Sequence, residues 1–96
     1  MIYEEVHITV DPKRREEFVK VYRQAWKDAA FEGSHLGKIM RAIEHEDKIG
    51  VLIEWDDLAA HRQHRGSEKS RRFREAIDPY MKHFEVWHYE LEELVD

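Results

Sequence analysis

The sequence predicts an α+β fold with the element order β-α-β-β-α-β, formed as a single domain by residues 1–96. Three observations lead to this prediction. Alternation of apolar and polar residues marks strands near both ends and in the middle of the chain. Apolar residues at helical spacing fill the two intervening segments, and no Pro/Gly/Ser-rich linker divides the chain.

The first third of the chain reads as a strand followed by a helix. Ile2 to Val10 alternates, which places Val6, Ile8 and Val10 on one face of the expected strand. Asp11-Pro12 ends this strand and starts a helix, because Asp caps a helix N-terminus and Pro suits the first helical position. The helix is expected to run for about five turns to a point near Gly33, with an apolar stripe made of Phe18, Tyr22, Ala25, Trp26 and Ala29.

The middle of the chain predicts an antiparallel hairpin. Two β-type runs, Lys38 to His45 and Lys48 to Trp55, are separated by the polar pair Glu46-Asp47. The second run is almost wholly apolar, so we expect it to lie in the middle of the sheet.

The last part predicts a broken helix and a final strand. Asp56 or Asp57 can cap a helix that runs to about Arg65, and Gly66-Ser67 breaks and restarts it. The apolar stripe continues to Met81, with a kink or a new turn expected at Asp78-Pro79. His83 to Leu91 then alternates, with Phe84, Val86 and His88 on one face.

This element order is the ferredoxin-like arrangement, in which two helices pack on one face of a four-stranded antiparallel sheet. The other face stays bare unless something covers it. A second copy of the chain is the simplest cover, so we predict a homodimer in which two sheets form an α+β barrel.

Composition excludes several classes of function. The net charge of −5 argues against nucleic-acid binding, and no apolar stretch approaches the roughly 20 residues that span a bilayer. Cysteine is absent, which excludes thiol chemistry and fits the cytoplasm. One segment, His61 to Arg74, carries six basic residues and one acidic residue. It is read as a solvated helix face, or as a surface that guides an acidic small ligand.

Histidines are the main candidates for chemistry. His7 and His88 lie inside predicted strands, where an imidazole of pKa about 6.5 can act as acid or base, although a buried structural histidine is the alternative. His61 and His64 stand one helical turn apart, a spacing that can also serve a metal pair. Because neighbouring arginines repel a cation, we predict surface histidines there and no metal site.

Tryptophans 26, 55 and 87 suit core packing, and a pocket lined by them would favour a flat aromatic ligand. The chain has no glycine-rich phosphate loop and no nucleophile elbow, so kinase, nucleotide-binding and serine-hydrolase functions lack support.

Four stretches resemble the antibiotic biosynthesis monooxygenase family of dimeric α+β barrels: Ile8–Phe18, Leu52–His61, Ser67–Phe73 and Val86–Tyr89. The resemblance implies a ferredoxin-like protomer, a homodimer, and a ligand cleft between sheet and helices. Relatives include enzymes that oxidise polycyclic phenols or quinols with O₂ and without a cofactor, and others that degrade haem. Trp55 matches a tryptophan that lines the pocket of several relatives.

The sequence also departs from two family patterns. The chain contains no asparagine, whereas these oxygenases often carry one on the first strand, near Val6 or His7 here. The haem-degrading relatives carry a helix histidine in the segment after Ser67, where this chain has Arg71, Arg72 and Phe73, so haem is the less favoured ligand.

The leading hypothesis is therefore a monooxygenase that oxidises a small aromatic substrate without metal or flavin. The predicted base is His7 or His88, the pocket walls are Trp55, Trp26 and Tyr22, and Arg71 or Arg72 attracts an anionic substrate. The alternative is a non-catalytic dimer that binds a small ligand in the same cleft.

Overall fold

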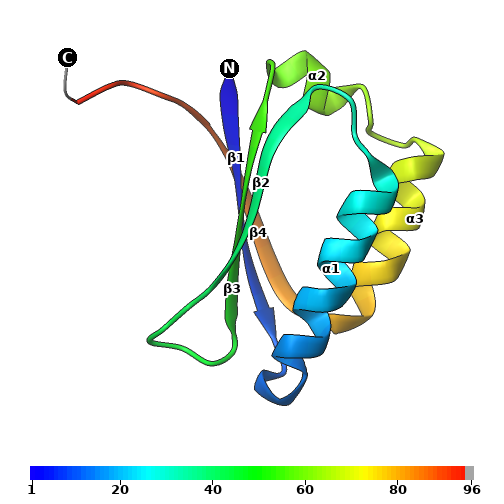
Figure 1. The fold of residues 1–96 in the computed structure, drawn as a ribbon, viewed down its shortest axis with the longest axis vertical. Helices are drawn as coiled ribbons and strands as arrows, with labels where there is room; N and C mark the ends of the chain where they lie inside the picture. Colours follow the sequence, from blue (N-terminus) through cyan, green and yellow to red (C-terminus); the bar gives the residue numbers. More distant parts are fainter. Residues whose placement is uncertain (95–96) are drawn as a thin grey trace.

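Four antiparallel strands form one sheet, and two helices cover one of its faces (Figure 1). The computed structural model describes residues 1–94. The strands are β1 (Ile2–Val10), β2 (Ser34–Arg41), β3 (Lys48–Trp55) and β4 (Met81–Glu90). The α-helices are α1 (Arg15–Ala29), α2 (Leu58–Arg62) and α3 (Glu68–Ile77), with short 3₁₀ turns at η1 (Pro12–Arg14) and η2 (Asp78–Tyr80).

The strand order is β2-β3-β1-β4, and every neighbouring pair is antiparallel. This confirms the predicted ferredoxin-like βαββαβ fold. Alternation along the central strand β1 turns Glu4, Val6, Ile8 and Val10 toward the helices. Tyr3, Glu5, His7 and Thr9 point to the opposite side, which we call the open face.

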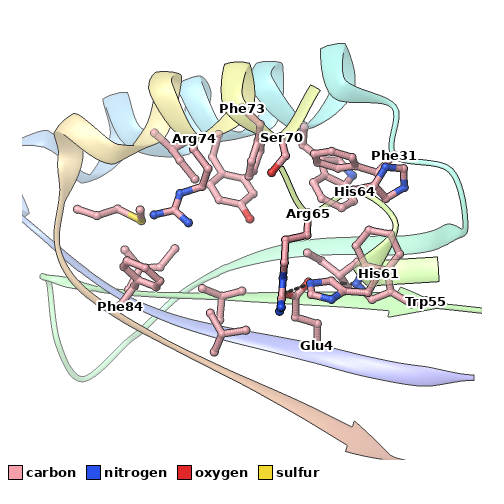
Figure 2. Close-up of a pocket in the computed structure, with 18 of the residues that line it drawn as sticks. Glu4, Phe31, Trp55, His61, His64, Arg65, Ser70, Phe73, Arg74 and Phe84 are labelled. Atoms are coloured by element: carbon pink, nitrogen blue, oxygen red, sulfur yellow. Dashed lines mark hydrogen bonds and ion pairs between the residues drawn. The ribbon is translucent and has the colours of Figure 1, made fainter. Parts of the chain in front are cut away.

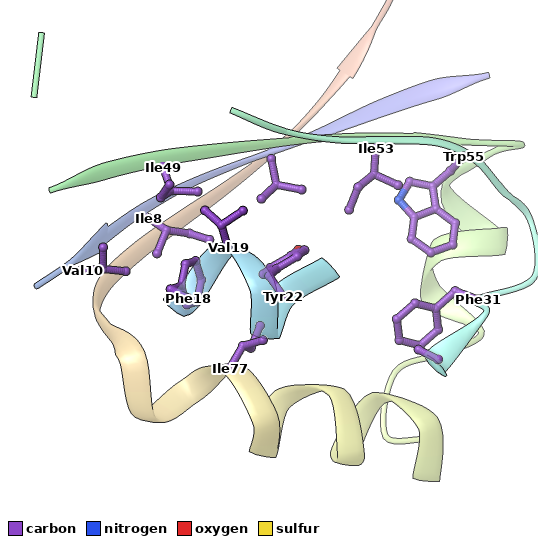
Figure 3. Packing of buried hydrophobic residues seen from close by; sticks show 12 residues of the cluster. Ile8, Val10, Phe18, Val19, Tyr22, Phe31, Ile49, Ile53, Trp55 and Ile77 are labelled. Carbon is purple, nitrogen blue, oxygen red and sulfur yellow. The ribbon is translucent and has the colours of Figure 1, made fainter. Parts of the chain in front are cut away.

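The core lies between α1 and the two middle strands (Figure 3). Phe18 and Val19 of α1 point toward Ile8 and Ile49 of the sheet, and all four side chains are almost fully buried. Burial of this apolar area stabilises the layer contact at about 25 cal/mol per Å². Trp55 and Phe31 close the core at the end near α2.

Helix α1 begins as predicted and ends earlier than predicted. The Asp11 carboxylate accepts a hydrogen bond from the Lys13 backbone N–H at 3.0 Å, and Pro12 opens the 3₁₀ turn that leads into the helix. The helix ends at Ala29 because Ala30 takes a left-handed conformation, with φ of 45°. Gly33 serves the following turn instead, where its φ is 87° and a Cβ would lie 2.8 Å from the Ala60 Cβ.

Strand β2 lies nearer the N-terminus than predicted. It ends at Arg41, and residues 42–47 form a loop in which Ile43 is 93% exposed. The Arg15 guanidinium on α1 donates hydrogen bonds to the carbonyls of Ala42 and His45, both at 3.1 Å. These contacts satisfy backbone acceptors that a longer strand would have placed in the sheet.

The α2–α3 region also differs in its bounds from the prediction. Asp57 caps α2 by accepting from the Ala60 N–H at 2.7 Å, but the helix ends at Arg62 rather than near Arg65. Ser67 then caps α3. Asp78-Pro79 forms the 3₁₀ turn η2, and β4 starts directly after it, two residues before the predicted His83.

The open face carries large exposed side chains and has no helix over it within residues 1–94 (Figure 1). Trp87, Tyr89 and Met40 on this face are 54%, 45% and 42% exposed. No helix in the same part of the chain has the length and apolar character needed to cross a membrane.

Candidate functional site

A cavity of about 380 Å³ lies between the sheet and the helices (Figure 2). Strands β1 and β4 form its floor, α3 forms its roof, and the segment around α2 closes one end. Its lining is mainly apolar and aromatic, with a polar group at the α2 end where Glu4, His61 and Trp55 meet.

Glu4 is a carboxylate buried in a central strand. It is only 8% exposed, because alternation turns it inward with Val6 and Ile8. The indole N–H of Trp55 donates to its Oε1 at 3.0 Å. Its Oε2 remains directed toward two imidazoles. A buried carboxylate is costly without such partners, so this arrangement explains how the strand tolerates the charge.

His61 is the imidazole nearest to Glu4. Its Nε2 lies 3.2 Å from Glu4 Oε2, and its ring packs against the Trp55 indole with centroids 5.2 Å apart. Nδ1 of the same ring is buried and has no hydrogen-bond partner among the described residues. The prediction of a surface histidine here was wrong: the one-turn helix α2 turns His61 inward, and its side chain is only 22% exposed.

His88 joins the same group from the edge strand. It stands opposite Glu4 in the β1–β4 register, and its Nε2 lies 3.8 Å from Glu4 Oε2. The His61 and His88 ring centroids are 4.6 Å apart. The structure therefore places the sequence-predicted His88 beside a carboxylate and a second imidazole.

Charge and burial set the protonation of this group. Burial alone would raise the pKa of Glu4, but hydrogen bonds from His61 and Trp55 outweigh it and lower the pKa below its usual value. The pKa of His88 is also lowered, first by burial and then by the nearby His61, against the opposite effect of Glu4. Glu4 is therefore ionised and His88 neutral at pH 7.

The rest of the cavity is an aromatic chamber. The predicted wall residues Tyr22, Trp26 and Trp55 all line it. Trp26 meets Trp55 edge to face at 6.3 Å between centroids, and Phe73 of α3 contacts both Trp26 and Tyr22. Burial raises the pKa of Tyr22, so its phenol stays protonated. Such walls suit a flat aromatic molecule.

Arg71 and Arg72 are not among the residues that line the cavity. Both lie on the exposed side of α3, where Arg71 pairs with Glu68 and Glu75 and Arg72 pairs with Glu68. The cations that do line the cavity are Arg65 and Arg74. Arg74 lies over the Phe84 ring at 5.0 Å, and Figure 2 shows Arg65 reaching from the α2–α3 turn toward Glu4 and His61.

His7 lies on the open face, away from this cavity. Its Nε2 is 2.7 Å from the Glu5 carboxylate, and its side chain is 52% exposed. It lines a separate depression on that face, with Trp87 and Met40. The structure therefore does not bring the two sequence-predicted bases, His7 and His88, together.

Sequence reasoning missed Glu4, although a signal was available. The alternation that places Val6, Ile8 and Val10 on one face also places Glu4 there. A charged residue on the apolar face of a strand predicts a partnered buried group. His64, considered with His61 as a pair, instead contacts the carbonyl of Glu32 at 2.8 Å through Nε2.

The fold and the chamber together define a ferredoxin-like α+β domain with an aromatic cavity between its layers. Solved structures with this fold include an antibiotic biosynthesis monooxygenase candidate from Bordetella bronchiseptica, which has a TM-score of 0.84 and 22% identity and covers 96% of this chain and 97% of its own. SnoaB from Streptomyces nogalater, a cofactor-independent oxygenase solved in a mutant form, has a TM-score of 0.81 and 15% identity, with coverage of 98% and 95%. A conserved protein from Methanosarcina mazei has a TM-score of 0.80 and 19% identity, with coverage of 95% and 92%.

The model of the antibiotic biosynthesis monooxygenase family matches residues 1–76. The chain belongs to this family. Among functionally curated protein sequences, none matches it. At these identities the structural neighbours establish the fold, and function depends on the site.

Proposed function

We propose that the protein is a monooxygenase that oxidises a small aromatic substrate, a quinol or polycyclic phenol, with O₂ and without metal or flavin. The observation that carries this proposal is the Glu4–His61 pair at one end of an aromatic cavity. Family membership and the fold shared with SnoaB, a cofactor-independent oxygenase, support it.

His61 is the proposed base. A carboxylate only accepts hydrogen bonds, so Nε2 of His61 donates to Glu4 and Nδ1 is the ring's proton acceptor. Nδ1 is buried and has no hydrogen bond within residues 1–94, so in this proposal the ring turns to bring Nδ1 to the cavity when substrate binds. When His61 takes the phenolic proton, Glu4 at 3.2 Å stabilises the imidazolium. His88 assists as a second imidazole that faces the same oxygen of Glu4.

The substrate anion then supplies the electrons. It passes one electron to O₂, and the resulting radical and superoxide combine to form a carbon–oxygen bond. The His61 imidazolium returns its proton to the peroxide oxygen. Loss of hydrogen from the same carbon and cleavage of the O–O bond release water and leave a carbonyl, so that one oxygen atom enters the product. Arg65 and Arg74 line the cavity and stabilise the negative charge that develops on oxygen.

Oxygen uptake with a panel of quinols and anthrones tests this function. We expect consumption of one O₂ per product and a loss of about 10²-fold or more in His61→Gln, the usual contribution of a general base. His45→Gln is the matched control, because His45 lies exposed in the 42–47 loop. Turnover in His61→Gln equal to that of the unaltered chain would remove the proposed base. Saturable binding without oxygen uptake would favour the ligand-binding alternative.

We also infer that the working unit is a homodimer in which two open faces meet. The exposed Trp87, Tyr89 and Met40 side chains on this face support the proposal, because burying them removes apolar area from water. His7 would then lie at the interface rather than act as a base. A cytoplasmic location and the absence of nucleic-acid and membrane partners stay predictions from composition.

A further inference from the structure

Glu4, His61 and His88 converge from three different elements, β1, α2 and β4. Each offers one ligand atom, and the three atoms lie within 4.8 Å of one another. We call this group the carboxylate–histidine cluster. It is the only group of three such residues with this spacing in residues 1–94.

We propose that the carboxylate–histidine cluster binds a divalent first-row transition-metal ion, for which Zn²⁺ is the representative. One carboxylate oxygen and two imidazole nitrogens form a donor set of intermediate softness, which suits Zn²⁺, Fe²⁺ and Co²⁺ better than Ca²⁺ or Mg²⁺. Three protein ligands leave coordination positions open toward the cavity, as in metal sites that also bind water or a small molecule.

The spacing of the donors fits this ion. Ligand distances of about 2.0–2.2 Å from Zn²⁺ place the donors of a tetrahedral site roughly 3.4 Å apart. Glu4 Oε2 lies 3.2 Å from His61 Nε2 and 3.8 Å from His88 Nε2. Both separations from Glu4 are within about 0.4 Å of the tetrahedral value, and all three donor atoms lie within 4.8 Å of one another.

The surroundings of Glu4 favour the site as well. The Trp55 indole N–H occupies Oε1, which orients the carboxylate and leaves Oε2 facing the two imidazoles. Hydrogen bonds of this kind position the ligands of metal sites. The His61 ring has no partner at Nδ1 within the described residues, so it can turn toward an ion without breaking a second contact.

Charged residues near the carboxylate–histidine cluster both favour and oppose the binding of a cation. The buried Glu4 carboxylate attracts a cation strongly because water does not screen it. Arg65 lines the same cavity and opposes a cation. Replacing Arg65 with glutamine is therefore expected to tighten metal binding, in contrast to replacement of a ligand.

A bound ion would occupy the imidazole that serves as the base in the proposed oxygenase reaction. We therefore expect Zn²⁺ to inhibit that reaction. Metal binding is measured without substrate, so the metal proposal and the oxygenase proposal can fail separately.

Co²⁺ titration of the purified full chain, followed by visible absorption and by competition with Zn²⁺, tests the proposal. We expect one ion per chain. Affinity should fall by about tenfold or more in Glu4→Gln, His61→Gln and His88→Gln. His64→Gln is the matched control, because His64 sits one turn from His61 but contacts the Glu32 carbonyl instead.

Variants at the buried Glu4 and His61 can fail to fold, so His88→Gln is the decisive variant. The His88 side chain is 32% exposed on an edge strand, and its replacement disturbs the core least. Circular dichroism establishes that each variant is folded. Equal affinity in His88→Gln and the unaltered chain would overturn the proposal, as would no Co²⁺ binding at millimolar concentration or weaker binding in Arg65→Gln.

Discussion

Glu4 shows how one residue can determine the character of a cavity. Its carboxylate is buried in the middle of the sheet, and it stays charged because an indole and an imidazole donate to it. Trp55 lies 51 residues away along the chain, and His61 is farther still. Pattern analysis can show that Glu4 points inward, but only the folded chain shows which groups meet it.

The lowered pKa of Glu4 predicts a pH dependence of stability. A carboxyl group whose folded pKa is depressed stabilises the fold above its unfolded pKa of about 4.5, and this contribution is lost as pH falls through the folded pKa. The free energy of unfolding should therefore fall more steeply below pH 4.5 in the unaltered chain than in Glu4→Gln. Urea unfolding in the presence of a chelator at several pH values measures this.

The exposed Glu46 provides a comparison for this measurement. Glu46→Gln should retain the pH dependence of the unaltered chain. Parallel curves for Glu4→Gln and the unaltered chain would contradict the assignment of the effect to Glu4.

At the scale of elements, the short helix α2 decides whether His61 reaches the cavity. It has only five residues, and Asp57 caps its first turn. A helix this short depends strongly on its cap and on tertiary contacts. We therefore expect Asp57→Ala to destabilise the fold by about 1 kcal/mol and to lower the rate of the proposed oxygenase reaction by displacing His61.

Asp57→Asn is the matched variant, because asparagine also caps helices well. It should restore both stability and turnover. Thermal unfolding and oxygen uptake measure the two effects, and an alanine variant with unchanged values in both would show that the cap does not position His61.

The elements also show where sequence analysis succeeds and where it does not. Strands β1 and β3 were predicted with their observed bounds because their alternation or apolar run is uninterrupted. Strand β2 was predicted too far toward the C-terminus, because Ala42-Ile43 looks like a continuation of the strand. In the structure these residues belong to a loop whose carbonyls accept hydrogen bonds from Arg15 of α1. The predicted helix α1 ran on to Gly33 because glycine commonly ends a helix in the left-handed conformation. In the structure Ala30 takes the left-handed conformation, and the helix ends at Ala29, before Gly33 is reached.

The residues of the candidate site were also predicted only in part. Trp55, Trp26 and Tyr22 were predicted as walls and do line the cavity, because large aromatic residues on inward faces must meet in a domain this small. Arg71 and Arg72 were predicted to attract the substrate, whereas Arg65 and Arg74 are the arginines that line the cavity. Which arginine of a basic segment faces inward depends on where α2 ends and α3 begins, and the sequence placed that break only approximately.

For the whole molecule, the uncovered sheet predicts self-association. Trp87→Glu introduces a charge into the open face and should shift the protein from dimer to monomer, as measured by analytical ultracentrifugation. Ile43→Glu is the control, since Ile43 is 93% exposed in the loop after β2. A folded monomer for the unaltered chain at micromolar concentration would contradict the proposed homodimer.

The positions of the three tryptophans give the molecule two built-in optical reporters. Trp26 and Trp55 face the chamber, while Trp87 lies on the opposite side of the sheet. Intrinsic fluorescence of a Trp87→Phe variant would respond mainly to occupancy of the chamber. Emission from Trp87, isolated by replacing the other two indoles with phenylalanine, would report on the environment of the uncovered surface. One spectrometer could thus follow filling of the chamber and pairing of protomers as separate events.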